Sequence, residues 1–395
     1  MDYTSLLWRK FSFPDPIRIR RCQKMPELGP KILFFSGGSA LNKISRTLKH
    51  YTHNSIHLVT PFDSGGSSAR LRDEFTMPAI GDLRSRLMAL ADETVLGQPE
   101  VYKLFNYRLD KTGSLTELKQ ELIRMVEGQH ELITPIMEPM RQLIRTQLSV
   151  ILSRISANFD LRGASIGNLI IAGGYLNNQQ QLDSIVFLFS RLVGALGTVQ
   201  TIVNSTYHLA AELDNGDIVI GQHNITGKEK APLATPIKRI FLSESPIDCC
   251  PIKCNVLLDR QDMIKNADLI CYPPGSFYSS LLANLLPVGV AESIKSNPNL
   301  KVYLPNLGLD PEQLGMGLVQ QVETIIKTVS GESTMNSKGI LDFLILDSRY
   351  FNQQATSDID TIKSLGVDIL VAPLVKDASL YYDEDAVSQF LVSLV

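Results

Sequence analysis

The feature that most constrains the fold is a repeated unit: a short apolar run, a loop of small residues, and then a helical pattern. The apolar runs are residues 31–35, 56–60 and 267–272, and the loops after them are rich in glycine and serine. Buried strands that alternate with helices are typical of a parallel sheet with helices on both faces. The sequence therefore predicts an α/β fold that begins with a strand–helix–strand unit.

Further apolar runs extend the predicted sheet. Their length and β-rich composition are typical of buried strands, and they lie at residues 201–203, 302–305, 343–346 and 368–372. Residues 165–176 are predicted to form a helix. The expected architecture is Rossmann-like, with three α/β/α layers around a mostly parallel sheet. Its expected parts are an N-terminal extension (1–30), a main α/β domain (31–330) and a C-terminal α/β extension (331–395) packed on the same domain.

Two segments depart from the parallel pattern. Residues from about 85 to 155 are almost all helical in pattern, and we interpret them as a helical insertion that serves as a lid, as the surface of a homodimer, or as both. Residues 207–213 and 218–222 flank an Asn-Gly pair, which supplies the positive φ angles of a tight turn. They are predicted to form an antiparallel β-hairpin excursion.

Charge and hydropathy argue against several classes of partner. The 38 Lys and Arg residues against 41 Asp and Glu give a formal net charge of −3, so no overall field attracts nucleic acid or an anionic membrane. No apolar run reaches the roughly 20 residues of a bilayer-spanning helix. The chain has five cysteines, an odd number, and we expect no secretory leader. We therefore expect a cytoplasmic protein without a nucleic-acid or membrane partner.

The first glycine-rich loop has the composition of a phosphate-binding turn. Gly37, Gly38 and Ser39 lie between the first predicted strand and a helix. Small residues there let backbone N–H groups approach phosphate oxygens at the positive end of the helix. The loop is neither GxGxxG nor a P-loop, so a plain tight turn is the alternative interpretation.

The second loop adds a carboxylate to the small residues. Asp63 follows the second predicted strand and precedes Gly65, Gly66, Ser67 and Ser68. A carboxylate at this position could hold Mg²⁺, orient a ribose hydroxyl or accept a proton from an attacking hydroxyl. A capped turn is the alternative.

The third loop repeats the arrangement of the first. Pro274, Gly275 and Ser276 follow the predicted strand 267–272 and lead into a helix. Next to them, Tyr278 could stack on a base or belong to the core. Ligands of open α/β sheets bind beyond the carboxyl ends of the strands, so the three loops are expected to meet at one cleft.

Two other kinds of side chain are candidates for ligand contact. Four arginines downstream of Asp63 could offset the charge of a diphosphate or face solvent, namely Arg70, Arg72, Arg84 and Arg86. Asn168 is a polar residue in an apolar helical segment, and both ligand contact and a structural hydrogen bond remain open for it.

These motifs resemble, in order, those of the family that contains the 2-phospho-L-lactate transferase of deazaflavin-cofactor biosynthesis and the bacterial gluconeogenesis factor. The matching segments lie within about residues 31–325 and are residues 37–40, 63–70, 81–84, 165–169, 208–213, 274–280 and 284–286. The double-glycine, double-serine form of the Asp63 loop is closer to the gluconeogenesis-factor branch.

The resemblance implies a Rossmann-like core and a nucleotide-containing small molecule as the partner. That ligand would be a guanosine- or uridine-diphosphate compound, cradled by the first and third loops. In the transferase branch the resemblance also implies a Mg²⁺-assisted attack on a diphosphate. Asp63 would then bind Mg²⁺ or take the acceptor's proton, and Arg84 would offset the charge that develops on phosphate oxygens.

The sequence also departs from the family pattern. Ser64 stands where the family's loop has a second aspartate, which removes one potential metal ligand or base. We therefore expect a regulatory or metabolic protein that binds a nucleoside diphosphate compound without turning it over. The alternative is a Mg²⁺-dependent transferase that moves a phospho-lactyl-type group from a nucleoside diphosphate donor to an acceptor hydroxyl.

Overall fold

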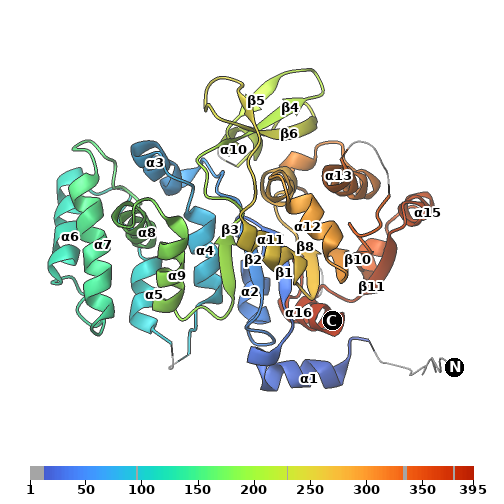
Figure 1. Cartoon of the computed structure of the whole chain (residues 1–395), viewed down its shortest axis with the longest axis horizontal. Coiled ribbons are helices and arrows are strands. Elements are labelled where there is room, and N and C mark those ends of the chain that lie inside the picture. Colours follow the sequence, from blue (N-terminus) through green and yellow to red (C-terminus); the bar gives the residue numbers. More distant parts are fainter. Residues whose placement is uncertain (1–12, 95–96, 229, 332–335, 377–378) are drawn as a thin grey trace.

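The computed structural model describes residues 13–395 apart from 95–96, 229, 332–335 and 377–378. At its centre lies a seven-stranded sheet in the order β11-β10-β9-β8-β1-β2-β3, and every neighbouring pair in it is parallel (Figure 1). The strands are β1 (Ile32–Ser36), β2 (Ile56–Val59), β3 (Thr198–Thr201), β8 (Leu269–Tyr272), β9 (Leu300–Tyr303), β10 (Phe343–Asp347) and β11 (Asp368–Ala372).

Strand β1 lies inside the sheet and is buried on both faces. Ile32 and Phe34 join one core cluster, whereas Leu33 and Phe35 join another. Successive side chains of a strand point to opposite faces, so a strand covered on both sides is apolar throughout. The predicted three-layer α/β/α architecture is thereby confirmed.

Helices cover both faces of this sheet. The Ile32 face packs against α2 (Asn42–Leu48) and α16 (Glu384–Ser393), with α1 (Pro16–Lys24) outside them. The Leu33 face packs against α11 (Leu258–Lys265), α12 (Val290–Ser296), α13 (Leu318–Ser330) and α15 (Thr356–Ser364). Short helices α10 (Gln222–Ile225) and α14 (Ser348–Phe351) lie in connections.

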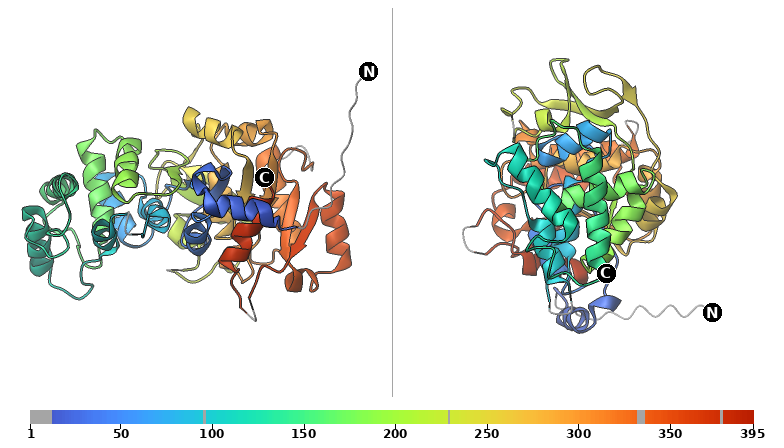
Figure 2. Two further views of the ribbon diagram at one scale, coloured as in Figure 1. Left: turned by 90° about the horizontal axis from the view of Figure 1, so that it is seen from below. Right: turned by 90° about the vertical axis from the view of Figure 1, so that its left-hand side faces the viewer.

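A helical lobe extends beyond β3, at the left of Figure 1 and the near side of the right-hand view in Figure 2. It has its own apolar core. Its helices are α3 (Gly66–Phe75), α4 (Gly81–Leu90), α5 (Pro99–Asn106), α6 (Leu115–Glu127), α7 (Met140–Arg154), α8 (Ile166–Asn177) and α9 (Leu182–Leu192). The lobe is longer than the predicted insertion because α8 packs against α7 rather than against the sheet.

A second, antiparallel sheet has the strand order β5-β4-β6-β7. It consists of β4 (His208–Leu213), β5 (Ile218–Ile220), β6 (Ile237–Ser243) and β7 (Pro251–Ile252). The hairpin predicted around Asn215-Gly216 is confirmed as β4 and β5. Strand β6 was not predicted, because its sequence IKRIFLS lacks the period-two alternation of a half-buried strand.

The predicted strands of the main sheet are confirmed, with two shifts: the strand predicted at 302–305 is Leu300–Tyr303, and a larger shift affects β3. The prediction of a strand at 201–203 is corrected to Thr198–Thr201. Ile202 and Val203 are buried, but they lie beyond the last residue pair of β2 and β3, which is Val59 with Thr201. The Ile202 N–H donates to the Val59 carbonyl at 2.9 Å and closes the ladder, so only Val203 is apolar and buried without pairing to β2. Within the described residues, no helix is long and apolar enough to cross a membrane.

Candidate functional site

The strand order brings the three glycine-rich loops to one edge of the sheet. From β1 the chain moves outward through β2 to β3, and it later returns to the other side of β1 with β8. The order of the strands therefore reverses between β1 and β8. The loops that leave two such strands diverge, and the crevice between them is where open α/β sheets bind ligands.

A cleft of about 310 Å³ opens at this edge, and we call it the polar cleft. It is formed by the first two loops, the start of α4, α8 and the segment around α10. Of the predicted site residues, it brings together Gly38, Ser39, Asp63, Gly65, Gly66, Ser68, Arg84 and Asn168. The side chain of Ser67 lies outside the described part of the chain.

Two carboxylates line the polar cleft. Asp63 accepts a 3.0 Å hydrogen bond from the backbone N–H of Gly65 through Oδ1. Asp82, in the first turn of α4, accepts a hydrogen bond from the backbone N–H of Gly38. Burial raises the pKa of Asp82, and the Gly38 bond and the positive charges of Arg86 and Lys228 oppose the rise. Asp82 was not among the predicted catalytic residues, although the family motif contains it.

Among the described residues, three cationic side chains line the polar cleft: Arg84 on α4, Arg108 after α5, and Lys228 after α10. Burial, and then the nearby Arg108, lowers the pKa of Arg84 to about 10, so Arg84 stays charged at neutral pH. Its Nη1 donates to the Phe105 carbonyl at 3.4 Å. Lys228 donates to Ser276 Oγ at 3.1 Å and so reaches the third loop.

The other candidate arginines have structural contacts. Arg70 donates to the carbonyls of Asp160 and Arg162 and forms an ion pair with Asp160. Arg72 is buried and donates to the carbonyls of Thr206 and Tyr207. Arg86 is fully buried and donates to Ser45 Oγ and the Gly38 carbonyl.

The first loop is held close to the helix after the third loop. A Cβ atom on Gly37 would lie 2.8 Å from Ser280 Oγ and 2.9 Å from Ser280 Cβ, so no larger residue fits there without a shift. Gly38 has a φ of +59°, a left-handed conformation that glycine adopts without strain. Buried Asn284 joins the two segments, because its Nδ2 donates to the Ser36 carbonyl at 3.0 Å.

Hydrogen bonds hold the second loop to α4 on one side and to α10 on the other. Ser68 Oγ accepts hydrogen bonds from the backbone N–H groups of Ile80 and Gly81, each at 3.1 Å, and so caps the start of α4. Ser64 Oγ lies 2.7 Å from His223 Nδ1, which ties the loop to α10. Ser68 therefore has a structural role at the cleft wall, and His223 is a lining residue that was not predicted.

The third loop lines a second cavity, which we call the adjoining pocket. This pocket has a volume of about 620 Å³, and its lining includes Pro274, Gly275 and Ser276. It shares Ser39 and Lys228 with the polar cleft, so the two cavities are adjacent. Asn306 fixes the loop, because it accepts the Gly275 N–H at 2.8 Å and donates to the Gly275 carbonyl at 2.7 Å.

The structure corrects two expectations about the third loop. The backbone N–H groups at the start of the following helical turn already bind protein carboxylates: Phe277 donates to Asp310, and Tyr278 and Ser279 donate to Glu312. They are therefore not a phosphate cradle. Tyr278 is buried with its hydroxyl 3.1 Å from the Ile237 carbonyl, so it is a core residue rather than a platform for a base.

The sequence held only partial signals for the residues that were not predicted. Asp82 shares a short motif with Arg84, whereas Arg108 and Lys228 lie in irregular segments without any motif. Asn168 is buried and lines the cleft, and its backbone N–H donates to Ser165 Oγ. Its position is compatible with both roles considered for it.

Asp63 and Asp82 could hold Mg²⁺ together with a ligand. Within the described residues, no group of three or more His, Cys, Asp or Glu side chains could hold a metal ion. Mg²⁺ is usually bound through one or two carboxylates, water and the phosphates of a substrate. The two carboxylates of the polar cleft fit this mode of binding, which depends on the phosphates.

Known proteins match the chain in sequence and in fold. A family model described as 2-phospho-L-lactate transferase CofD matches residues 32–375, which extends past the resembling motifs within about residues 31–325. The gluconeogenesis factor of Bacillus subtilis (strain 168) is 28% identical over 388 residues, which cover 93% of this chain and 98% of the relative. The gluconeogenesis factor of Halalkalibacterium halodurans is 28% identical over 276 residues, 70% of this chain and 66% of the relative.

A crystal structure of a UPF0052-family protein from Bacillus halodurans has the same fold. The TM-score is 0.66 at 24% sequence identity, and the match covers 91% of this chain and 98% of the other. Because the family model matches from the first strand of the main sheet to just beyond the last, this protein belongs to the 2-phospho-L-lactate transferase CofD family.

Proposed function

We propose that this protein binds a nucleoside diphosphate compound, of the GDP or UDP type, with its phosphates in the polar cleft. The observation that carries the proposal is the convergence of Arg84, Arg108 and Lys228 beside the glycine-rich ends of β1 and β2. Cations from three segments offset the charge of a diphosphate, and small residues let the backbone approach it. The binding would take place in the cytoplasm.

The nucleoside of the ligand would lie in the adjoining pocket. It adjoins the polar cleft at Ser39 and Lys228, and its wall carries Leu309, Leu380 and Tyr381, which are exposed apolar side chains. The Lys43 ammonium lies 5.3 Å from the centre of the Tyr381 ring. An aromatic ring beside polar loop groups suits the face of a base together with its ribose.

A role in binding and regulation is favoured over turnover. The relatives named above are called gluconeogenesis factors, and the loop of Asp63 has serine where the family's loop carries a second aspartate. A protein that needs only to hold its ligand requires the cations and the small residues of the cleft. It does not require a complete set of metal ligands.

Transfer is the second candidate, and Asp82 is the observation that favours it. Asp82 adds a second carboxylate to the cleft, from α4 rather than from the loop of Asp63. Bound Mg²⁺ would neutralise charge on the diphosphate. Asp63 would accept the proton of an acceptor hydroxyl while the oxygen of that hydroxyl attacks phosphorus. The bridging P–O bond would break, a nucleoside monophosphate would leave, and Arg84 would stabilise the developing charge.

Thermal unfolding of the purified protein tests the proposal directly. GDP, UDP, UDP-sugars, GMP and UMP would each be added with and without Mg²⁺, because a ligand that binds only the native state raises the unfolding midpoint. We expect one diphosphate class to raise the midpoint more than its monophosphate. A Mg²⁺-dependent rise would justify a transfer assay, and no rise with any nucleotide at millimolar concentration would contradict the proposal.

A further inference from the structure

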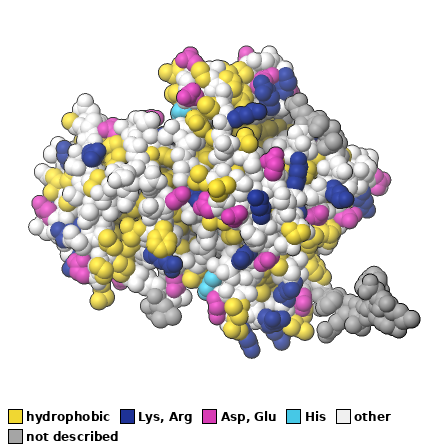
Figure 3. Space-filling model, viewed as in Figure 1, with side chains coloured by type: hydrophobic (Ala, Val, Ile, Leu, Met, Phe, Trp, Pro, Cys, Tyr) yellow, Lys and Arg dark blue, Asp and Glu magenta, His cyan; other side chains and the backbone are white. Residues whose placement is uncertain are grey.

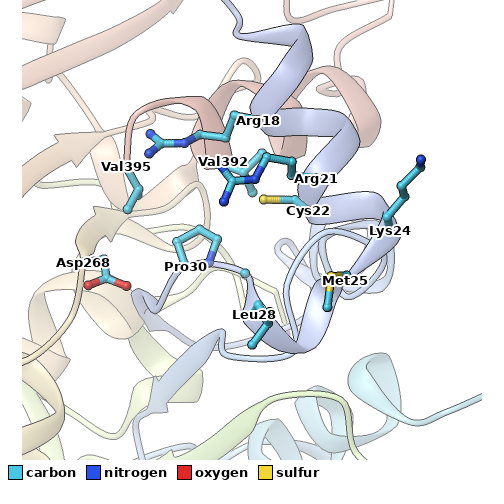
Figure 4. Close-up of a pocket in the computed structure, with 11 residues that line it drawn as sticks. Arg18, Arg21, Cys22, Lys24, Met25, Leu28, Pro30, Asp268, Val392 and Val395 are labelled. Carbon is cyan, nitrogen blue, oxygen red and sulfur yellow. The ribbon is translucent and has the colours of Figure 1, made fainter.

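A third cavity lies at the amino ends of the strands of the main sheet, on the side opposite the polar cleft. It has a volume of about 450 Å³, and we call it the basic pocket. Its walls are α1, the segment that leads into β1, the residue before β8, and the end of α16 (Figure 4). The amino ends of the strands point here, whereas the polar cleft lies beyond their carboxyl ends.

Three cations of α1 line the basic pocket: Arg18, Arg21 and Lys24. Within the described residues, none of them forms an ion pair. In Figure 4, Arg18 and Arg21 point into the space between α1 and the end of α16. Burial raises the pKa of the Cys22 thiol, and the charges of Arg18 and Arg21 oppose the rise, so both guanidinium groups lie near this thiol, which also lines the pocket.

The other walls combine a carboxylate with apolar surface. Asp268 lies across the pocket from the two guanidinium groups (Figure 4), and its Oδ2 accepts the Lys31 N–H at 2.8 Å. Met25 and Leu28 line the pocket and are 50% and 74% exposed. Figure 3 shows that basic and hydrophobic side chains gather on the lower edge of the molecule, where α1 lies; Figure 2 shows α1 uncovered from below.

We propose that the basic pocket binds a small organic anion, with its phosphate or carboxylate group between Arg18 and Arg21. Two guanidinium groups present paired donors that match the oxygens of such a group. A hydroxyl of the ligand donates to Asp268, and its carbon skeleton packs on Met25 and Leu28. The three cations still outnumber the anionic groups when the α-carboxylate of Val395, which also lines the pocket, is counted with Asp268, so the pocket favours a ligand with net negative charge. The site is independent of the nucleotide proposed for the polar cleft.

The methyl group of Met25 reports on this pocket alone, because Met25 does not line the polar cleft or the adjoining pocket. The full chain would be labelled with ¹³C-methyl methionine, and the Met25 resonance would be assigned with Met25→Leu. Glucose 6-phosphate and citrate serve as phosphate and carboxylate probes, and glucose as the neutral control. We expect the Met25 resonance to shift saturably with at least one of the two anions and not with glucose.

Arg20 provides a matched control for the charge of α1. It belongs to the same helix and is exposed, but it does not line the pocket. We expect Arg21→Ala to weaken binding by about tenfold or more and Arg20→Ala by less than about twofold. Arg84→Ala, in the polar cleft, should leave the Met25 shift unchanged. Thermal midpoints would verify that all variants fold.

Two results would overturn the proposal. The first is a Met25 resonance that does not move with either anion at millimolar concentration. The second is a shift that Arg20→Ala weakens as much as Arg21→Ala, because general attraction to a basic helix would then explain the effect.

Discussion

Glu312 holds Ser279 through both carboxylate oxygens: Oε2 accepts the Ser279 N–H at 2.8 Å, and Oε1 lies 2.5 Å from the Ser279 hydroxyl oxygen. The same Oε2 accepts the N–H of Tyr278 at 2.8 Å. The positive end of this helical turn is therefore neutralised by the protein itself. Ser276, which accepts from Lys228, is the group of the third loop that connects it to the polar cleft.

Glu312 should make stability depend on pH. Burial, and then the nearby Asp310, raises the pKa of Glu312 from 4.5 to about 7. The folded state thus keeps a proton that the unfolded state releases between about pH 4.5 and about pH 7, so this contribution is complete below that window and lost as pH rises through it. We expect the free energy of unfolding of Glu312→Gln, measured with urea, to fall less between about pH 5 and about pH 7.5 than that of the native protein.

A second glutamate variant separates this effect from a general change in charge. Glu323→Gln removes a carboxylate from α13 that pairs with Lys327 at the surface. Its unfolding free energy should follow the native pH dependence. Equal pH dependence in Glu312→Gln and the native protein would contradict the role of Glu312.

Gly37→Ala should distort the first loop by a steric contact with Ser280. The new Cβ would lie 2.8 Å from Ser280 Oγ, and overpacking of this kind costs about 1–3 kcal/mol. Ser280→Gly removes both contacting atoms, so the double variant should recover part of the loss. Thermal unfolding of the two single variants and the double variant measures this coupling.

Gly38→Ala is the matched control for that experiment. Its Cβ would meet no atom within 4 Å, but its φ of +59° strains an alanine. The expected loss of about 1–2 kcal/mol should not recover with Ser280→Gly. The steric explanation for Gly37 would be wrong if Ser280→Gly restored no stability to Gly37→Ala. It would also be wrong if Ser280→Gly restored stability to Gly38→Ala.

Arg84→Ala should weaken the binding of a nucleoside diphosphate. The Arg84 guanidinium lies in the cleft and is charged at neutral pH, and a lost charge-assisted hydrogen bond costs about 1.5–3 kcal/mol, or roughly 10- to 100-fold in affinity. Arg70→Ala removes the same charge outside the cleft and should change the affinity little. Titration calorimetry of both variants tests the assignment, and equal affinities would refute it.

Asp63→Asn discriminates binding from transfer. A binding protein should keep most of its affinity, because the amide can still accept the Gly65 N–H at Oδ1. A transferase should lose turnover by orders of magnitude, because an amide cannot take the proton of the acceptor. Affinity would be measured by calorimetry and turnover by the release of nucleoside monophosphate. Retained turnover would exclude Asp63 as the base.

The sequence predicted the local elements of the site well and their contacts poorly. The loops after β1 and β2 were recognised, because strand ends and glycine clusters are local signals. The carboxylates that occupy the amides after Pro274–Ser276 were missed. Asp310 and Glu312 lie more than 30 residues further along the chain, and no local pattern indicates which amides they meet.

By itself, the sequence determined the α/β class, most strands of the main sheet, the hairpin around Asn215-Gly216 and the family motifs, since each depends on short-range periodicity or on residue identity. Tertiary structure alone decided which charges meet. Arg70, Arg72 and Arg84 look alike in the sequence, yet only Arg84 lines the polar cleft, where Arg108 and Lys228 join it. The reason is physical: the direction of a long side chain is set by the packing and hydrogen-bond partners around its helix, and these come from distant parts of the chain.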